Sequence, residues 1–469
     1  MQEIETCSLK EFERVAEMHV PPIYMSFPKV YQKYLIPDDL QDQFRSRWGT
    51  KRIVSPSMKI HLLRDVFVLA QGLVFTRNGR LVAETTTQHS EHDIKLAFDE
   101  LTSTLACSSP IASHPKGILC KKRGAENYGH WLVEMLPKAF WAARQLDLAE
   151  DWPAVILQTS GRMNEVVRQS LECIEFGTKR VLTTDRSACH FDELLVVDGL
   201  TNHSFFMSPL VFECMEFIAE KAPAIGEESL YVTRKSAKSR RFENEEQVSG
   251  FFAKCGYKEI DAGELSFLEQ VGAFKSARRL AGPMGAAFTN AIFCQPNTEM
   301  LMFMPASAQE YFFWHISEGK KLDYHEVRSA ESGPQRDALP WSRDIYISEQ
   351  ALRVLTKHFD DVGLVDQTLI NLRNEHELIL EHIKDKNWRL HFSHSPEEAH
   401  EINFNVDGTI GKYRHNNEYY WRLRDCQLEI LDISKTITWR FDFGQAHSMQ
   451  SSFMHNGNSD ITATLVESP

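Results

Sequence analysis

The sequence of 469 residues lacks the features that mark several common classes of protein. No run approaches the roughly 20 apolar residues that a membrane-spanning helix needs. The nine cysteines are scattered without a C-x-x-C pair, which is typical of reduced thiols rather than of a disulfide framework. The acidic N-terminal residues Met1–Glu5 lack the apolar core of a signal peptide. These absences predict a cytoplasmic protein.

Motifs for metals and for several cofactors are also missing. No two aspartates stand two positions apart, and no histidines show the H-x-x-x-H spacing of a ligand pair. Neither a G-x-x-x-x-G-K-[ST] loop nor a G-x-S-x-G turn occurs. No G-x-G-x-x-G follows a strand, which argues against a dinucleotide-dependent oxidoreductase. We therefore expect chemistry without a metal ion and without a resident cofactor.

The composition is that of a folded protein with an acidic surface. The net charge is −13, which argues against a nucleic-acid partner. Hydrophobic residues make up 42% and charged residues 25%, so the chain can bury the cores of two or three domains.

The hydrophobic pattern predicts an α/β protein. Residues 51–90 favour β hairpins after an irregular and helical lead-in, and short apolar strands then alternate with helices over about 116–205 and 229–317. After about 390 the pattern has period two, as in a small antiparallel β module. The predicted boundaries are 1–205 for a first domain of β hairpins and α/β units, 206–347 for a second Rossmann-like domain, 348–390 for a helical connection and 391–469 for the β module.

A glycine turn is the most informative segment. Residues Ala281–Phe293 predict a strand that ends in glycines, after which a helix begins. The first turn of a helix exposes unpaired N–H groups at the positive end of its dipole, which suits a phosphate. Gly285 and Ala286 are small enough to let a phosphate approach the backbone. The same pattern, taken alone, also fits a tight packing turn.

A short basic loop follows the preceding predicted strand, and it contains Arg234, Lys235, Lys238, Arg240 and Arg241. Arginine forks could hold a diphosphate through paired hydrogen bonds, or the loop could be solvated. Lys235, Lys238 and Arg240 are expected to be solvated.

Two helix starts follow this loop. Asn244 precedes a helix and has Gln247 three residues later, which resembles a capping box. Ser266 and Glu269 form a full capping box. Gln270 has no such explanation, so it could either face a ligand or pack.

A third motif spans Gly124–Pro137. Its residues His130 and Glu134 are four apart and therefore lie on one face of a helix that Asn127 can cap. Pro137 should kink this helix. The pair could supply a general base, or it could be a solvent-facing contact.

Together these motifs resemble the family 61 glycosyltransferases over about residues 116–317. The block Asn127–Pro137 is similar to the family pattern N-Y-x-H-W-L-x-(acidic)-x-L-P, with Glu134 where aspartate is usual. The resemblance implies an inverting, metal-independent transfer from a nucleotide sugar, expected to be UDP-linked, to a glycan hydroxyl. It also implies two Rossmann-like domains that face a cleft, the arrangement called GT-B.

The resemblance implies roles for particular residues. His130 and Glu134 would be catalytic, and either could be the base. Met284 stands where the family commonly has histidine and would pack on the nucleotide base. The donor-binding residues would be Arg234, Arg241, Asn244, Glu245, Gln270, Met284, Gly285, Ala286 and Asn290, and those on the acceptor side would be Asn127 and Tyr128.

The resemblance also implies a place and partners. Eukaryotic members are usually tethered by an apolar span, so its absence here implies a bacterial enzyme of capsule or other polysaccharide biosynthesis in the cytoplasm. Its partners would be a nucleotide sugar and a glycan or glycolipid acceptor. Peripheral contact with the inner membrane and an oligomeric state are compatible with this assignment.

The aromatic tail leaves a second function open. Trp421 and Trp439 are expected to fill the core of the β module, whereas exposed aromatic residues there could stack on sugars. A non-catalytic glycan-binding or scaffold protein on a glycosyltransferase fold is therefore the alternative.

Overall fold

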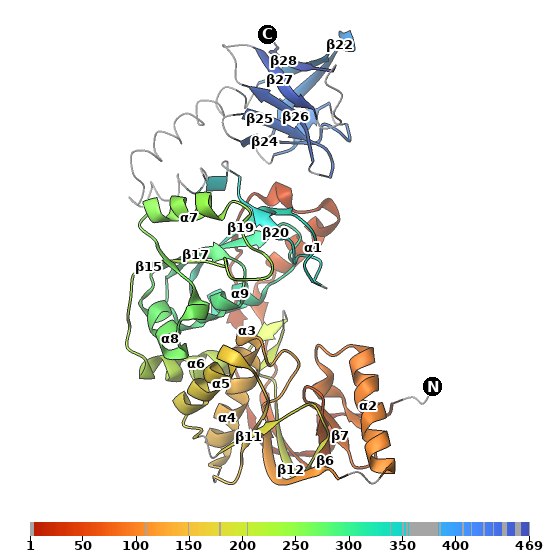
Figure 1. Cartoon of the computed structure of the whole chain (residues 1–469), viewed down its shortest axis with the longest axis vertical. Coiled ribbons are helices and arrows are strands. Elements are labelled where there is room, and N and C mark those ends of the chain that lie inside the picture. The colour runs from red at the N-terminus through yellow and green to blue at the C-terminus, as the bar shows by residue number, and fades with distance from the viewer. Residues whose placement is uncertain are drawn as a thin grey trace.

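The computed structural model is shown in Figure 1. It describes residues 4–468 apart from 108–109, 149, 178–179, 204, 338, 349–350, 353–354, 356–382, 384–385, 406–407, 414, 425–426, 435, 443–447 and 455–460. Most of the predicted helical connection 348–390 lies outside the described residues.

The first part of the chain forms a mixed sheet of nine strands in the order β1-β8-β7-β6-β12-β9-β10-β11, with β2 paired to β6. Strands β9 to β12 pair in parallel, whereas β6 and β7 form an antiparallel hairpin within the predicted 51–90 segment. The strands are β1 (Thr6–Cys7), β2 (Glu13–Met18), β6 (Met58–Leu69), β7 (Leu73–Thr76), β8 (Leu81–Val82), β9 (Ala112–Leu119), β10 (Ala154–Leu157), β11 (Val181–Thr184) and β12 (Cys189–Asp198).

The second sheet is mostly parallel and has the order β16-β15-β17-β18-β19-β20, with β4 paired to β19. Only β20 pairs in the antiparallel direction. The strands are β4 (Lys29–Tyr31), β15 (Ser229–Val232), β16 (Lys258–Ile260), β17 (Arg279–Pro283), β18 (Glu299–Pro305), β19 (Asp323–Ser332) and β20 (Asp344–Tyr346).

Helices connect these strands, and their caps follow from local sequence. Ser266 and Glu269 form the expected capping box at the start of α8. The α-helices of the two units are α1 (Asp38–Trp48), α2 (Glu91–Ala106), α3 (Tyr128–His130), α4 (Leu136–Leu146), α5 (Gly161–Cys173), α6 (Pro209–Lys221), α7 (Glu245–Lys254), α8 (Phe267–Ser276) and α9 (Phe312–Lys320). The remaining short elements are η1 (Leu9–Glu11), η2 (Lys33–Leu35), η3 (Ala83–Thr86), η4 (Trp131–Met135), η6 (Ala262–Glu264), η7 (Ala286–Phe293), the pair β3 (Ile23–Tyr24) and β5 (Arg52–Ile53), and the pair β13 (Thr201–Asn202) and β14 (Phe206–Met207).

The helix that carries the His–Glu motif is irregular in the middle. Asn127 accepts hydrogen bonds from the N–H groups of Gly129 and His130 and thereby caps α3, as predicted. A π-helical turn, η4, then joins α3 to α4. Pro137 lies in the first turn of α4, where its missing N–H is tolerated. The predicted kink is therefore a π turn, which widens the helix where Glu134 lies.

The N-terminal segment does not stay with the first sheet. Strand β4 pairs in parallel with β19 of the second sheet. Helix α1 packs there too, because the buried Arg328 guanidinium lies 4.5 Å from the ring centre of Phe44. The predicted first domain, 1–205, thus gives residues 29–31 to the other sheet, and the predicted irregular lead-in includes four short strands. Sequence pattern could not show this, because short edge strands carry little periodicity.

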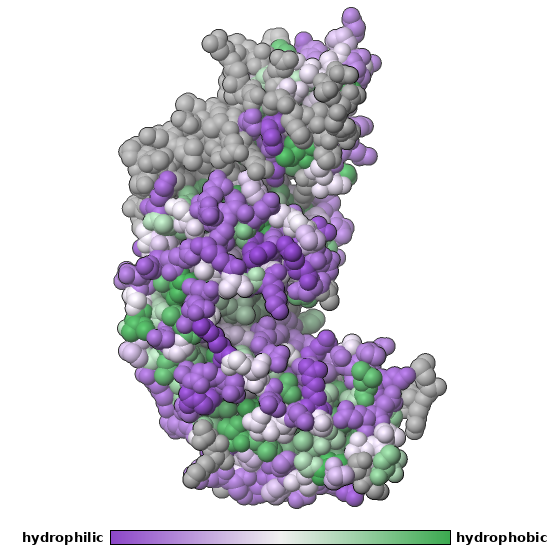
Figure 2. Space-filling view, in the orientation of Figure 1, coloured by the Kyte–Doolittle hydropathy of each residue, from purple (hydrophilic) through white to green (hydrophobic). Residues whose placement is uncertain are grey.

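One hydrophobic core joins the two α/β units. Trp131 and Leu132 of the first unit belong to the same buried cluster as Phe288 and Phe293 of the second. Figure 2 shows the surface notched at the right of the view, between the upper and lower parts, with hydrophilic residues along its borders. Helix α3 lies near this level in Figure 1.

The C-terminal strands form an antiparallel sheet in the order β23-β22-β21-β28-β27-β26-β25-β24. Trp421 and Trp439 are each 3% exposed and belong to its buried cluster, as expected. The strands are β21 (Trp388–Phe392), β22 (Ser395–Phe404), β23 (Ile410–Lys412), β24 (Tyr420–Arg424), β25 (Gln427–Leu431), β26 (Ile437–Asp442), β27 (Ser448–Met454) and β28 (Ala463–Glu467).

None of the helices in the described part of the chain combines the length and the apolar character that crossing a lipid bilayer requires.

Candidate active site

Both α/β sheets have a topological switch point. In the first sheet, β10 and β11 extend from one side of β9, and β12 lies on its other side. In the second sheet, β16 lies on one side of β15 and β17 on the other. Ligands of open α/β sheets bind in the crevice at the carboxyl ends of such strands. The His–Glu motif follows β9, and the basic loop and glycine turn follow β15 and β17.

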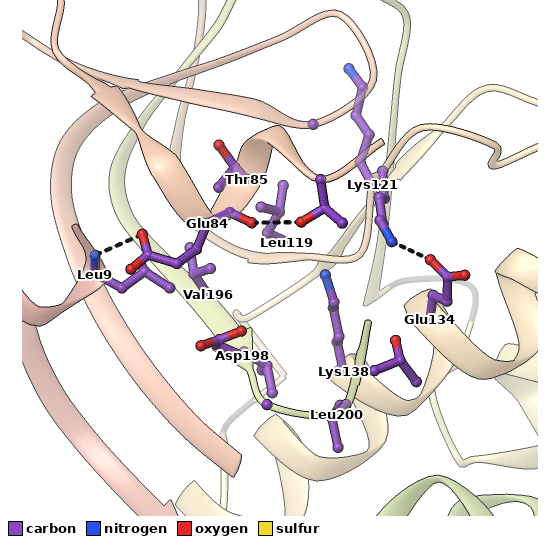
Figure 3. Close-up of a pocket in the computed structure, with 16 residues that line it drawn as sticks. Leu9, Glu84, Thr85, Leu119, Lys121, Glu134, Lys138, Val196, Asp198 and Leu200 are labelled. Atoms are coloured by element: carbon purple, nitrogen blue, oxygen red, sulfur yellow. Dashed lines mark hydrogen bonds and ion pairs between the residues drawn. The ribbon is translucent and has the colours of Figure 1, made fainter. Parts of the chain in front are cut away.

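A buried carboxylate organises the first of these positions. Glu134 is 1% exposed, and its Oε1 lies 2.7 Å from His130 Nδ1 and 3.2 Å from His203 Nδ1. Lys122 Nζ donates to its other oxygen, Oε2. Figure 3 shows Glu134 beside a small polar pocket that Lys138 and Asp198 also line. The alternative of a solvent-facing His–Glu contact is therefore wrong for Glu134.

The charges in this cluster are well defined. Burial alone would raise the pKa of Glu134, but hydrogen bonds from His130 and His203 and the charge of Lys122 lower it well below its usual range. Burial would lower the pKa of His203, but Glu134 and Glu310 raise it to about 9. At neutral pH the cluster thus holds a carboxylate and a His203 imidazolium.

His203 also links the two units. Its Nε2 lies 3.1 Å from Glu310 Oε2, in the loop between β18 and α9. Its ring stacks on Phe312 at 5.4 Å between centroids. With both ring nitrogens facing carboxylates, His203 cannot accept a proton from a substrate.

His130 differs from His203 in this respect. Its Nδ1 is held by Glu134, whereas its Nε2 has no hydrogen-bond partner among the described residues. The side chain is 21% exposed, so Nε2 can be reached from outside. An imidazole held at Nδ1 by a carboxylate and open at Nε2 has the form of a general base.

The cluster also has the composition of a metal site. The ligand atoms of His130, Glu134 and His203 lie within 4.8 Å of one another. No local spacing rule could reveal this group, because His203 is 69 positions from Glu134 along the chain. The absence of histidines at H-x-x-x-H spacing therefore does not exclude a ligand set built by the tertiary fold, and a metal-free mechanism remains a prediction.

At the switch point of the second sheet, Arg234 of the basic loop lies beside the glycine turn. A Cβ atom on Gly285 would lie 1.7 Å from Arg234 Nη1, so only glycine leaves room for this guanidinium. Arg234 Nη2 donates to Ser239 O at 3.1 Å, but its Nε is buried without a partner in the described structure. Burial and the neighbouring Arg240 lower the pKa of Arg234 to about 10.

Arg240 was expected to be solvated, and this expectation is wrong. Its Nε is buried and unpartnered among the described residues, and burial lowers its pKa. Two half-buried arginines side by side repel each other, so an anion between them would be favoured.

Arg241 has a partner already. Its Nη2 lies 3.0 Å from Asp344 Oδ2, and this carboxylate raises its pKa. Arg336 contacts the same oxygen at 2.9 Å. Arg241 therefore anchors the basic loop to β20, and its predicted role in donor binding would require it to share Asp344.

Glu245 and Asn244 follow the basic loop. Glu245 Oε1 accepts hydrogen bonds from Tyr231 and Thr233 at 2.8 and 3.0 Å, while Oε2 is buried without a partner in the described structure. Asn244 occupies the N-cap position of α7 but makes no side-chain cap. Its amide instead pairs with the backbone of Ile347, so the predicted side-chain cap is wrong, and the predicted donor contact remains a prediction.

Three other predicted donor residues lie inside the protein. Met284 is 2% exposed and belongs to the main core, so it offers no surface to a nucleotide base. Asn290 is fully buried, donates to Gln270 Oε1 at 2.9 Å and accepts from Tyr128 Oη. The chain Tyr128–Asn290–Gln270 thus fastens α3 to η7. Met284 and Asn290 are thus buried in this structure, and their predicted contacts with the donor remain predictions.

A pocket of about 400 Å³ lies beside these residues. Tyr128, Gln270 and Ala286 line it, so these three predicted residues do border an open space. Its apolar walls are made by residues of α5, of the segment between β16 and α8 and of the start of α8: Met163, Val166, Ala262, Leu265 and Phe267. Size and lining are those of a small-molecule site.

Residues 128–301 match the family model described as Glycosyltransferase 61, which supports the resemblance seen in the sequence motifs. The protein is therefore a glycosyltransferase. The matched segment contains both switch-point positions, with His130, Glu134, His203 and Arg234, and it ends before Glu310. No curated protein matches the chain.

Sequence reasoning missed four residues of these two positions: Lys122, His203, Arg240 and Glu310. Lys122 carried a local signal, since it lies just before the Gly124–Pro137 motif in a loop after a parallel strand. Arg240 belongs to the basic loop, but its burial could not be predicted from its neighbours in sequence. His203 and Glu310 carried none, because only the tertiary fold brings them to Glu134.

Proposed function

We propose that this enzyme transfers a sugar, with inversion and without a metal ion, from a UDP-linked donor to a hydroxyl group of a glycan or glycolipid. In this proposal the two α/β units form a GT-B-like pair, with the acceptor at the first switch point and the donor at the second. The setting would be bacterial polysaccharide synthesis in the cytoplasm, at the inner membrane face. The observation that carries the proposal is the buried Glu134, which holds His130 with its Nε2 open.

His130 is the base in this mechanism. Its Nε2 takes the proton of the acceptor hydroxyl while the hydroxyl oxygen forms a bond to the anomeric carbon. The bond from that carbon to the UDP oxygen breaks on the opposite face, so the configuration inverts. Glu134 fixes the ring and stabilises the imidazolium that forms, as a carboxylate does in hydrolytic triads. Glu134 itself is a poor base, because its pKa lies well below the usual range.

His203 and Lys122 keep Glu134 ionised. The His203 imidazolium donates to Glu134 and to Glu310, and Lys122 occupies the second oxygen of Glu134. These cations compensate for the burial of the carboxylate. They act through Glu134 and need not touch the substrate.

Arg234 and Arg240 receive the leaving group. The β-phosphate gains negative charge as the glycosidic bond breaks, and preformed cations stabilise that charge. The first N–H groups of η7, at Ala286 and Ala287, add donors beside Gly285. Glu245 Oε2, which is buried and unpartnered among the described residues, accepts a hydrogen bond from a hydroxyl group of the sugar that is transferred.

The pocket of about 400 Å³ that Ala286 and Gln270 line would take the nucleoside. A thermal-shift screen of nucleotide sugars tests the proposal, because a ligand that binds the native state raises the melting temperature. A UDP-sugar should raise it in the wild type and not in Arg234→Ala. No shift with any nucleotide or nucleotide sugar would contradict the proposal.

A further inference from the structure

A second pocket lies where α1 meets the C-terminal sheet, and none of the motifs described above lines it. Its volume is about 480 Å³, which suits a ligand the size of one to three sugar rings. One wall comes from residues 27–48, and the other from Thr409, Tyr419 and Tyr420. The two walls touch, since a Cβ on Gly408 would lie 2.6 Å from the ring of Tyr34.

Aromatic side chains form much of the lining. Phe44 and Trp48 are buried at the base, with ring centres 5.0 Å apart, and Phe27 stands at the edge with 54% of its surface exposed. Tyr419 and Tyr420 face them from the C-terminal sheet. Aromatic faces present flat apolar area to the C–H faces of a sugar ring.

One carboxylate in this pocket is held in place but not saturated. Asp38 Oδ1 accepts hydrogen bonds from Gln41 Nε2 at 2.9 Å and from Tyr420 Oη at 3.1 Å. Its Oδ2 accepts none from the residues that the structure describes. A carboxylate oriented by two neighbours and open at one oxygen can accept hydrogen bonds from paired sugar hydroxyls.

Helix α1 links this pocket to the cluster of His130, Glu134, His203 and Glu310. The Asp38–Trp48 helix lines the pocket with one face, and on its other side Gln43 accepts a hydrogen bond from Gln309, the residue before Glu310. Arg47 of the same helix donates to Phe205 O, two positions after His203. A polymer that passes over α1 could therefore occupy this pocket while its end lies at His130.

From this combination we propose that the pocket between α1 and the C-terminal sheet is an accessory glycan-binding site, which holds the acceptor polymer several sugars away from the reacting hydroxyl. The proposal rests on the proposed transfer to a glycan. Phe27 stacks on a sugar ring, and Asp38 binds its hydroxyl groups. The C-terminal part of the chain contributes one wall of the site, which gives it a role in acceptor choice.

Calorimetry on the full chain with five hexasaccharides tests this proposal: maltohexaose, cellohexaose, laminarihexaose, chitohexaose and a hyaluronan hexamer. At least one should bind the wild type. Phe27→Ala and Asp38→Asn should each weaken that binding tenfold or more. Tyr24→Ala, an aromatic residue that is 73% exposed outside the pocket, and Asp39→Asn, on the same helical turn, are the matched controls and should leave it unchanged.

UDP binding, measured on the same samples, separates this proposal from the proposed function. Every variant should bind UDP as the wild type does, which also shows that it is folded. If no hexasaccharide binds, or if Phe27→Ala and Asp38→Asn bind as well as the controls, the accessory site is overturned while UDP binding still supports the transferase mechanism. Hexasaccharide binding without UDP binding would support the site and contradict the donor assignment.

Discussion

His203 Nε2 lies 3.1 Å from Glu310 Oε2, and this contact closes a chain of charges that begins at Lys122 and passes through Glu134. His203 follows the first sheet and Glu310 follows β18 of the second, so the contact crosses between the two α/β units. The charge of Glu310 also acts on Arg240 beside the glycine turn. The negative charge of Glu310 therefore acts on both His203, in the candidate base cluster, and Arg240, in the candidate leaving-group cluster.

This pair predicts a pH-dependent stability. The folded-state pKa of His203 is about 9, above the ordinary value of 6.5, because Glu134 and Glu310 favour the imidazolium. The stabilisation is thus fully present below pH 6.5 and is lost as the pH rises through 9. Melting temperatures across this range should fall for the wild type, and they should fall less for His203→Gln. Parallel curves for the two proteins would mean that His203 is not charged in the native state.

Replacement of the proposed base should affect turnover and spare donor binding. His130→Ala should reduce kcat by about 10²–10⁴-fold, the usual contribution of a general base, because the proton of the acceptor would have no receiver. The affinity for UDP should stay within about twofold, since His130 acts on the acceptor. Single-turnover kinetics and UDP calorimetry measure the two effects, and His92→Ala, an exposed histidine on α2, is the control.

Glu134→Gln should differ from His130→Ala in a specific way. Glutamine can still accept a hydrogen bond from His130, but it cannot neutralise Lys122 and His203, so both kcat and thermal stability should fall. Normal turnover in both Glu134→Gln and His130→Ala would place the base elsewhere.

The arginine pair should show the signature of a binding site rather than of a structural contact. Arg234→Ala and Arg240→Ala should each weaken UDP binding by about 1.5–3 kcal/mol, the worth of a charge-assisted hydrogen bond. The melting temperature without ligand should not drop, because each substitution removes a repulsion between two half-buried cations. Lys238→Ala, exposed in the same loop, should change neither quantity. Unchanged UDP affinity in both arginine variants would locate the diphosphate elsewhere.

Transfer activity should survive EDTA. The cluster His130, Glu134 and His203 could hold a divalent ion, but Lys122 already places a positive charge on Glu134 and opposes a second cation there. Activity before and after chelation, and again after Mn²⁺ or Zn²⁺ is added back, checks this expectation. Loss with EDTA and recovery with one ion would turn this cluster into a catalytic metal centre.

Much of the site follows from local sequence. Asn127 caps α3 because an N-cap side chain reaches the N–H groups two and three positions further along the chain. His130 meets Glu134 because residues four apart lie on one face of a helix. Gly285 lies beside Arg234 because the loops that follow neighbouring parallel strands lie at the same edge of a sheet. The alternation of strands and helices likewise predicted the α/β class, and period two predicted strands after residue 390.

Tertiary structure decided the rest. Whether Met284 and Asn290 are exposed or buried depends on which segments cover them, and both are buried. Whether Arg240 is solvated depends on the burial of its loop, which its neighbours in sequence do not reveal. The pairing of β4 with β19 brings α1 to the loop that holds Glu310, and the contact between Gln43 and Gln309 spans 266 positions of the chain.

The sequence by itself thus determined the chemistry-bearing helix, the glycine turn and the class of fold, because these depend on periodicities and spacings within a few residues. Only the tertiary structure decided which charges meet, namely His203 with Glu134 and Glu310. Electrostatic partners are selected by proximity in space and by burial, and neither quantity is encoded in the distance along the chain.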